Sequence, residues 1–131
     1  MKYLLDTHIW LWGSMQPDRL SGRVTKVLAD PQHELWLSPV SVWELTILCR
    51  KGRFRVHPDI ATWVAKNLSD SRLREAQLTV DVALAVSSIS FSHGDPADHF
   101  IAATAKVFDL TLVTADENLV GLRGIRVLAN R

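Results

Sequence analysis

Apolar and polar residues follow one another along the chain in blocks that predict short strands separated by helices. Brief apolar runs bounded by turn or charged residues are typical of buried strands, whereas apolar residues three and four positions apart are typical of helices. The predicted strands are Lys2–Leu5, Leu35–Leu37, Leu110–Val113 and Arg126–Leu128, and the predicted helices are Ser21–Ala29, Ser41–Arg50, Asp59–Leu68, Val80–Ile89 and Pro96–Phe108.

This alternation predicts the fold class. Strands joined through helices pair in parallel, and the helices then cover both faces of the sheet. We therefore expect an α/β fold with a mostly parallel central sheet. No linker-like stretch and no internal repeat divides residues 1–131, so a single domain is predicted.

Two helix starts carry acidic residues. Asp95 and Pro96 suit the cap and the first position of the helix that ends at Phe108. Ser41 and Glu44 have the spacing of a capping box, which predicts that their helix begins at Ser41 with Glu44 in its first turn.

Four carboxylates are predicted to lie at one edge of the sheet. Asp6 directly follows the first strand and Asp116 closely follows the strand Leu110–Val113, while Glu44 and Asp98 belong to first turns of helices. In an open parallel sheet, the carboxyl ends of strands and the starts of the following helices share the edge where ligands bind. Each acid alone could be a helix cap or a charge that complements a helix dipole. Only their joint position favours a shared site.

Such a group of acids needs a positive partner, because neighbouring carboxylates repel one another and raise one another's pKa. The chain has one cysteine, Cys49, and no histidine pair at metal-binding spacing. Oxygen-only ligands favour Mg²⁺ or Mn²⁺ over zinc. Either ion would activate a water and neutralise a scissile phosphate, which predicts a phosphodiesterase with one or two bound ions.

Four segments in order resemble the PIN-domain family, and more narrowly the VapC-type toxins of bacterial toxin–antitoxin pairs. The resemblance runs the length of the chain, although His99 stands where the subgroup often carries arginine. The four segments are Leu4–Trp12, Ser38–Glu44, His93–Ala105 and Leu112–Asp116.

The resemblance implies a PIN-like domain and an endoribonuclease that depends on Mg²⁺ or Mn²⁺. It further implies a type II system in which a cognate antitoxin protein inhibits the toxin, and a homodimer. By motif, Asp6, Glu44, Asp98 and Asp116 match the catalytic, metal-binding acids. Beside them, Thr7 and Thr114 match polar positions, and Asp95 matches an acid that caps a helix first and supports the site second.

Basic and aromatic residues suggest contacts with RNA. Arg50, Lys51, Arg53 and Arg55 could hold phosphates, although a solvated surface at a helix end explains them at least as well.

His8 and His93 flank the predicted site in sequence and could contact phosphate, although a structural role is the stronger alternative. Tryptophan is abundant, with five residues. Four of them are predicted to pack in the core, and any that is exposed could instead form a groove for an antitoxin segment or stack on bases. These four are Trp10, Trp12, Trp36 and Trp43.

Composition adds little to this picture. A net charge of +1 does not by itself indicate a polyanion partner. Asp6 and His8 interrupt the first apolar run, and no run reaches membrane-spanning length. A cytoplasmic protein without a membrane partner is therefore expected.

Two other functional classes are weighed against the nuclease. A catalytically silent PIN-like scaffold would bind only RNA or protein, but the complete set of four acids argues against it. A phosphatase of the haloacid-dehalogenase type would need a second aspartate at the position of His8, and a receiver domain would need a paired acid and a late lysine. The RNA target stays open.

Overall fold

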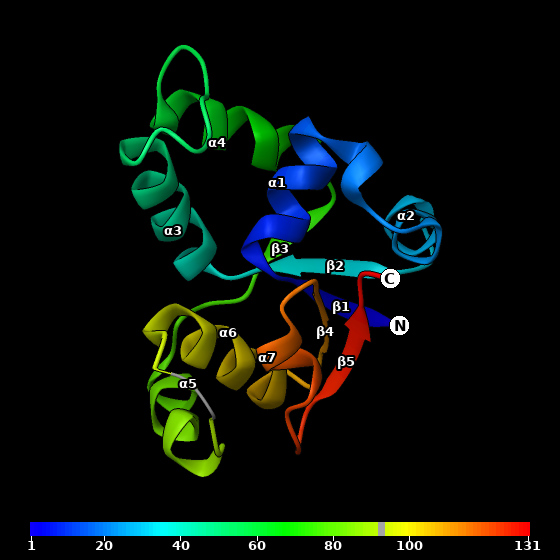
Figure 1. The fold of residues 1–131 in the computed structure, drawn as a ribbon, viewed down its shortest axis with the longest axis vertical. Helices are drawn as coiled ribbons and strands as arrows, with labels where there is room; N and C mark the ends of the chain where they lie inside the picture. Colours follow the sequence, from blue (N-terminus) through cyan, green and yellow to red (C-terminus); the bar gives the residue numbers. More distant parts are fainter. Residues whose placement is uncertain (92–93) are drawn as a thin grey trace.

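A computed structural model of the chain, which describes residues 1–91 and 94–131, has one sheet with helices on both sides (Figure 1). The strand order is β3-β2-β1-β4-β5, and each neighbouring pair is parallel. This confirms the predicted parallel α/β sheet. The strands are β1 (Lys2–Leu5), β2 (Glu34–Leu37), β3 (Leu73–Glu75), β4 (Thr111–Thr114) and β5 (Arg126–Ala129).

Helices connect successive strands of the sheet. Short 3₁₀ turns follow two of them, at Pro17–Arg19 and Val86–Ser88. The helices of the described part of the chain are α1 (Thr7–Met15), α2 (Gly22–Ala29), α3 (Pro39–Arg50), α4 (Ile60–Asp70), α5 (Val80–Ala85), α6 (Pro96–Val107) and α7 (Glu117–Val120). None of these helices is long and apolar enough to cross a bilayer.

The sheet separates two hydrophobic clusters, because successive side chains of a strand point to opposite faces. On β1, Tyr3 and Leu5 pack with residues of α1–α4, whereas Leu4 packs with residues of α5 and α6. Figure 1 shows α1, α3 and α4 on one side of the sheet and α5 and α6 on the other. Both faces are therefore covered, as the sequence predicts.

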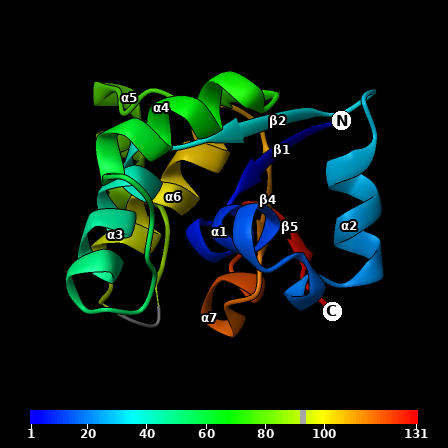
Figure 2. The ribbon, with the colours of Figure 1, turned by 90° about the horizontal axis from the view of Figure 1, so that it is seen from above.

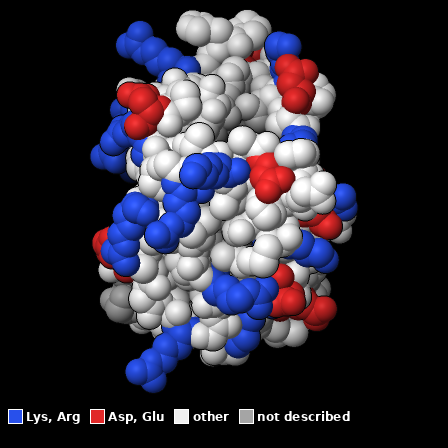
Figure 3. All heavy atoms as spheres, turned by 90° about the vertical axis from the view of Figure 1, so that its right-hand side faces the viewer, with Lys and Arg blue, Asp and Glu red and all other residues white. Residues whose placement is uncertain are grey.

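Helices α3 and α6 lie together at one end of the sheet, and α2 and both termini lie at the other (Figure 2). The alanines of α6 are small, so this helix packs closely against the sheet: Ala102 and Ala103 are fully buried. On the face beside α2 and the termini, basic and acidic side chains are interspersed rather than sorted by sign (Figure 3).

Three elements were not predicted from the sequence. Helix α1 begins only one residue after β1 ends, so Ile9 and Leu11 read as a continuation of the strand's apolar run. Strand β3 has three residues, two of them exposed, and α7 has four, so neither shows a clear period. The predicted helix Val80–Ile89 ends earlier, because the chain tightens into a 3₁₀ turn after Ala85.

The core cluster under α6 predicts a stability difference between two leucines. Leu4 is fully buried in the central strand β1, whereas Leu84 on α5 is 67% exposed. We expect Leu4→Ala to lower the free energy of unfolding by about 2–5 kcal/mol, because it leaves a cavity, and Leu84→Ala to lower it by less than about 1 kcal/mol. Urea unfolding followed by circular dichroism measures both, and equal losses would contradict this packing.

Candidate active site

The sheet topology creates a switch point at β1. The chain leaves β1 to form β2 on one side, while β4 pairs with β1 on the other side. Ligands of open parallel sheets bind beyond the carboxyl ends of the strands at such a point. A cavity of about 290 Å³ lies there, and its lining residues are Asp6, His8, Trp12, Glu44, Asp95, Asp98, Ala115 and Asp116. The structure thus brings the four predicted acids together, with Asp95 beside them.

Asp6 caps α1 and is buried at the carboxyl end of β1. Its Oδ1 accepts a hydrogen bond from the backbone N–H of Thr7 at 2.8 Å, and its Oδ2 accepts one from Thr114 Oγ1 at 2.6 Å. Thr114 Oγ1 in turn accepts from the backbone N–H of Asp116 at 3.0 Å. One threonine hydroxyl therefore links the two aspartates that follow the central strands.

Glu44 reaches the cavity from the second turn of α3. The helix begins at Pro39 and is capped by Ser38, whose Oγ accepts from the backbone N–H of Val40 at 3.1 Å. The predicted capping box at Ser41 is therefore wrong, because a proline at the first helical position extends the helix upstream of it. Instead, Thr7 Oγ1 hydrogen-bonds Glu44 Oε1 at 2.5 Å and Ser41 Oγ at 2.9 Å.

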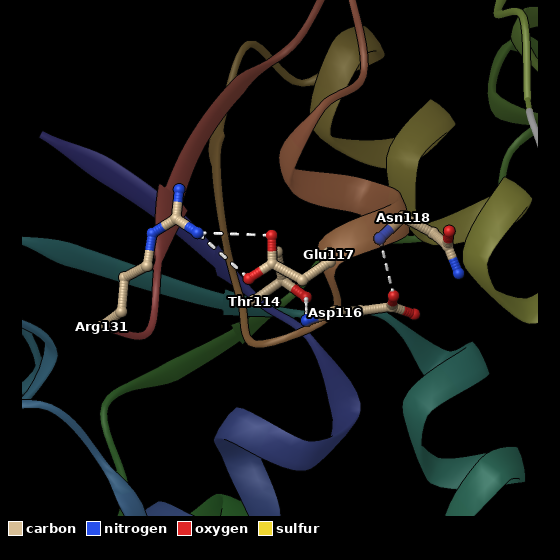
Figure 4. A network of polar contacts seen from close by, with 5 residues as sticks. All are labelled: Thr114, Asp116, Glu117, Asn118 and Arg131. Atoms are coloured by element: carbon tan, nitrogen blue, oxygen red, sulfur yellow. Dashed lines mark hydrogen bonds and ion pairs between the residues drawn. The ribbon is translucent and has the colours of Figure 1, made fainter.

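Asp116 combines a cap with a place in the cavity. Its Oδ1 accepts from the backbone N–H of Asn118 at 2.9 Å, at the start of α7 (Figure 4). The next residue, Glu117, pairs with Arg131 at 3.1 Å, so its negative charge is compensated outside the cavity. The two roles of Asp116, as a helix cap and as a site residue, are compatible in this geometry.

Helix α6 contributes two acids. Asp95 caps it by accepting from the backbone N–H of Ala97 at 3.1 Å, which confirms the predicted cap, and Asp95 also lines the cavity. Asp98 lies in the first turn and is buried. The neighbouring His99 stacks on Phe91 with ring centroids 3.8 Å apart. The histidine that replaces the arginine common in the resembled subgroup therefore packs against an aromatic ring.

Burial and mutual repulsion make this cavity favourable for a cation. Burial raises the pKa of Asp6 above its ordinary value, the hydrogen bonds from Thr114 and Thr7 and the charge of His8 oppose this rise, and the nearby charge of Asp116 adds to it. Burial likewise raises the pKa of Glu44, the Thr7 hydroxyl opposes this, and the charges of Asp6 and Asp95 add to it. A positive ion would relieve the repulsion in both cases.

The donor set suits a hard divalent ion by its chemistry, since all its acidic ligands are carboxylate oxygens. As the side chains stand, no three histidine, cysteine, aspartate or glutamate groups among residues 1–91 and 94–131 are grouped to hold one ion. Asp6 and Glu44 instead direct oxygens to threonine donors. The residues fit a hard divalent ion by the chemistry of their oxygens.

The other predicted contacts divide into two groups. His8 lines the cavity, whereas His93 lies outside the described residues. The basic residues lie at or beyond the end of α3, and none of them lines the cavity, so their contact with RNA stays a prediction. These residues, all exposed, are Arg50, Lys51, Arg53 and Arg55.

Two members of the cavity wall, Trp12 and Ala115, were not predicted from the sequence, and the predicted burial of one tryptophan is wrong. Trp12 lines the cavity one helical turn after His8, a relation that was hidden because α1 was not predicted. Trp43 is 54% exposed, so its predicted burial is wrong, whereas Trp10 is buried as predicted. Trp43 precedes Glu44, and the helix turns its side chain away from the core that Leu45 enters.

Comparisons with known proteins give the same fold and the same family. The family model described as PIN domain matches residues 3–124. Ribonuclease VapC22 of Mycobacterium tuberculosis (strain ATCC 25618 / H37Rv) is 34% identical over 117 residues, which is 88% of each chain.

Solved structures of VapBC complexes share the fold. VapBC2 from Rickettsia felis, bound to a promoter DNA fragment, has a TM-score of 0.73 at 16% identity over 98% of both chains. DNA-bound VapBC from Salmonella typhimurium has a TM-score of 0.67 at 18% identity over 100% of this chain and 99% of that chain. The family model and the 34% identity together show that the chain belongs to the PIN-domain family, among its VapC-type members.

Proposed function

We propose that this protein is an endoribonuclease that depends on Mg²⁺ or Mn²⁺ and acts as the toxin of a type II toxin–antitoxin pair. The observation that carries the proposal is the cavity at the switch point of the sheet, where five carboxylates from four segments meet. The 34% identical relative, which is named a ribonuclease, supports RNA as the substrate.

Asp6, Glu44, Asp98 and Asp116 would hold the ion or ions. A bound divalent ion supplies an activated water and neutralises charge on the scissile phosphate. Thr7 and Thr114 support this set by fixing one oxygen each of Glu44 and Asp6.

Asp95 has a different part in the proposal. Its carboxylate caps α6, as those of Asp6 and Asp116 cap their helices, but Asp95 is exposed, and its charge acts on Glu44. We therefore assign it to shaping the field of the site rather than to binding the ion directly.

A catalytically silent scaffold is the competing function. It would have no need to keep five repelling carboxylates in one small cavity, since unpaired buried charge destabilises a fold. Burial raises the pKa of both Asp6 and Glu44, which is consistent with this destabilisation. A cluster of acids that destabilises the fold favours a catalytic function over a silent scaffold.

For partners, we propose a cognate antitoxin, because several solved structures with this fold are VapBC complexes. A homodimer is also proposed, on the family resemblance alone. Sedimentation velocity of the chain alone and with the antitoxin encoded beside it would measure both assemblies, and a monomer that ignores the antitoxin would contradict them.

The nuclease proposal predicts cleavage that requires both metal and the cavity acids. Purified protein, freed of any bound partner, is incubated with a structured RNA pool in Mg²⁺, Mn²⁺ or EDTA. We expect cutting only with metal, and a loss of about 100-fold or more in Asp116→Asn, since one ligand of the ion is weakened. Asp81→Asn, an exposed acid of the first turn of α5, serves as the matched control and retains activity. Cutting in EDTA, or full activity in Asp116→Asn, would refute the proposal.

The buried charge of Asp6 predicts a stability effect that depends on pH. Its folded pKa is raised above the ordinary value of 3.8, so folding is favoured while Asp6 is protonated, and this stabilisation is lost as the pH rises through the folded pKa. At pH 7.5 in EDTA, Asp6→Asn should therefore melt about 2–8 °C above the wild type, on the scale of about 1 kcal/mol. The difference should shrink near pH 4.

Metal should reverse this order of stability. Mn²⁺ binds only the folded wild-type site, so it raises the melting temperature of the wild type and has a smaller effect on Asp6→Asn. Thermal unfolding with and without Mn²⁺ measures both effects, with Asp81→Asn as control. A variant that melts below the wild type in EDTA would show that the ionised Asp6 stabilises the fold instead.

A further inference from the structure

Aromatic rings form a second wall of the carboxylate cavity. His8 and Trp12 lie one helical turn apart on α1, and both line the cavity beside the acids. Their ring centroids are 5.5 Å apart, and His8 also lies 6.0 Å from Phe54, which follows α3. Both pairs are tilted by 57°. Two separate segments therefore hold the His8 ring at this position.

Within the described part of the chain, these two rings contribute to the site through ring contacts and charge rather than through hydrogen bonds, and the charge of His8 opposes the rise in the pKa of Asp6. His8 is exposed and makes no hydrogen bond with residues 1–91 or 94–131. Trp12 Nε1 is buried and has no acceptor within the same residues. The Arg19 guanidinium carbon lies 4.6 Å from the centre of the Trp12 ring, so a cation already fixes one side of the indole. Trp12 thus supports His8, and His8 presents its ring to the cavity.

The position of the rings indicates what they contact. Under the proposed function the carboxylates and their ion take the scissile phosphate, which leaves the ring wall to the part of the strand beside that phosphate. A nucleobase is neutral and flat, and every base offers a π-face to an aromatic ring. When a phosphate sits at the acids, a neighbouring base of the same strand falls within reach of this wall.

We propose that His8, backed by Trp12 and Phe54, is a stacking platform for one unpaired nucleobase next to the scissile phosphate. The proposal rests on the nuclease function and specifies its substrate class as unpaired RNA. A base inside a duplex keeps its faces stacked on its neighbours, whereas a loop or single strand can turn a base onto the platform.

Three substitutions at His8 separate stacking from other roles. The background is Asp116→Asn, so that binding is measured without cleavage, and the probe is a fluorescent single-stranded RNA oligonucleotide in Mg²⁺. We expect His8→Ala to weaken binding by about 5- to 150-fold, the range measured for loss of one stacked base. His8→Phe should stay within about threefold, and His8→Lys should resemble alanine. His57→Ala, an exposed histidine outside the cavity, is the matched control.

An abasic scan identifies the base itself. Each nucleobase of the oligonucleotide is removed in turn, and the loss of affinity is compared between the protein that keeps His8 and the His8→Ala variant. We expect one position whose removal weakens binding only when His8 is present. If His8→Lys kept the RNA affinity and His8→Phe lost it, His8 would contact a phosphate instead of a base. If no abasic position depended on His8, the platform would be overturned.

The same experiment separates this proposal from the nuclease proposal. Binding with a coupled abasic position, but no cleavage by the wild type, would refute the nuclease and keep the platform. Cleavage by the wild type with no coupled position would keep the nuclease and refute the platform. No detectable binding of the RNA would refute the platform as well.

Discussion

A hydrogen bond of 2.6 Å from the Thr114 hydroxyl to Asp6 Oδ2 joins the ends of the two central strands, and the geometry of the site depends on it. Strands β1 and β4 pair in parallel, so their carboxyl ends meet, and the next residues must leave the sheet in different directions. Asp6 begins α1 and Asp116 begins α7, while Thr114 holds both carboxylate segments at one point. The backbone of the sheet therefore fixes the separation of two acids before any ligand binds.

The same arrangement works against stability. Burial raises the pKa of Asp6 and of the half-buried Glu44, and their hydrogen-bond partners are neutral hydroxyls and backbone, while the charge of His8 opposes the rise at Asp6. Hydrogen bonds from hydroxyls recover part of the lost hydration, but they leave the net negative charge in place. The two hydrophobic clusters on either side of the sheet supply the compensating stability, since β1 and β4 are almost wholly buried. A destabilised site within a well-packed scaffold is the usual form of a functional site.

The sequence predicted those features that depend on local chemistry. Asp95 and Pro96 start α6 as expected, because a cap and a fixed φ act within a few residues. The order of strands and helices predicted the parallel sheet. The parallel sheet in turn predicted that the acids lie at the edge formed by the carboxyl ends of its strands. Glu44 was assigned to the right place for a wrong local reason: Ser38 caps the helix, and Glu44 faces the cavity through its contact with Thr7. That contact spans 37 positions of the chain, so no local pattern could reveal it.

The cavity is too small to enclose an RNA segment, and this limits how specificity can arise. At about 290 Å³, it lies at or below the range of pockets that surround a small ligand. On the proposed function, an RNA strand would therefore lie across the opening, with one phosphate at the carboxylates and a neighbouring base at the ring wall. The carboxylates are indifferent to sequence, because every linkage offers them the same phosphate. On the proposed function, we expect selection between RNAs to depend on whether a segment can leave its helix and present a base to the ring wall of α1. The residue after the first acid and its threonine, His8, is consequently the position where a local change would alter the choice of substrate without disturbing the acids.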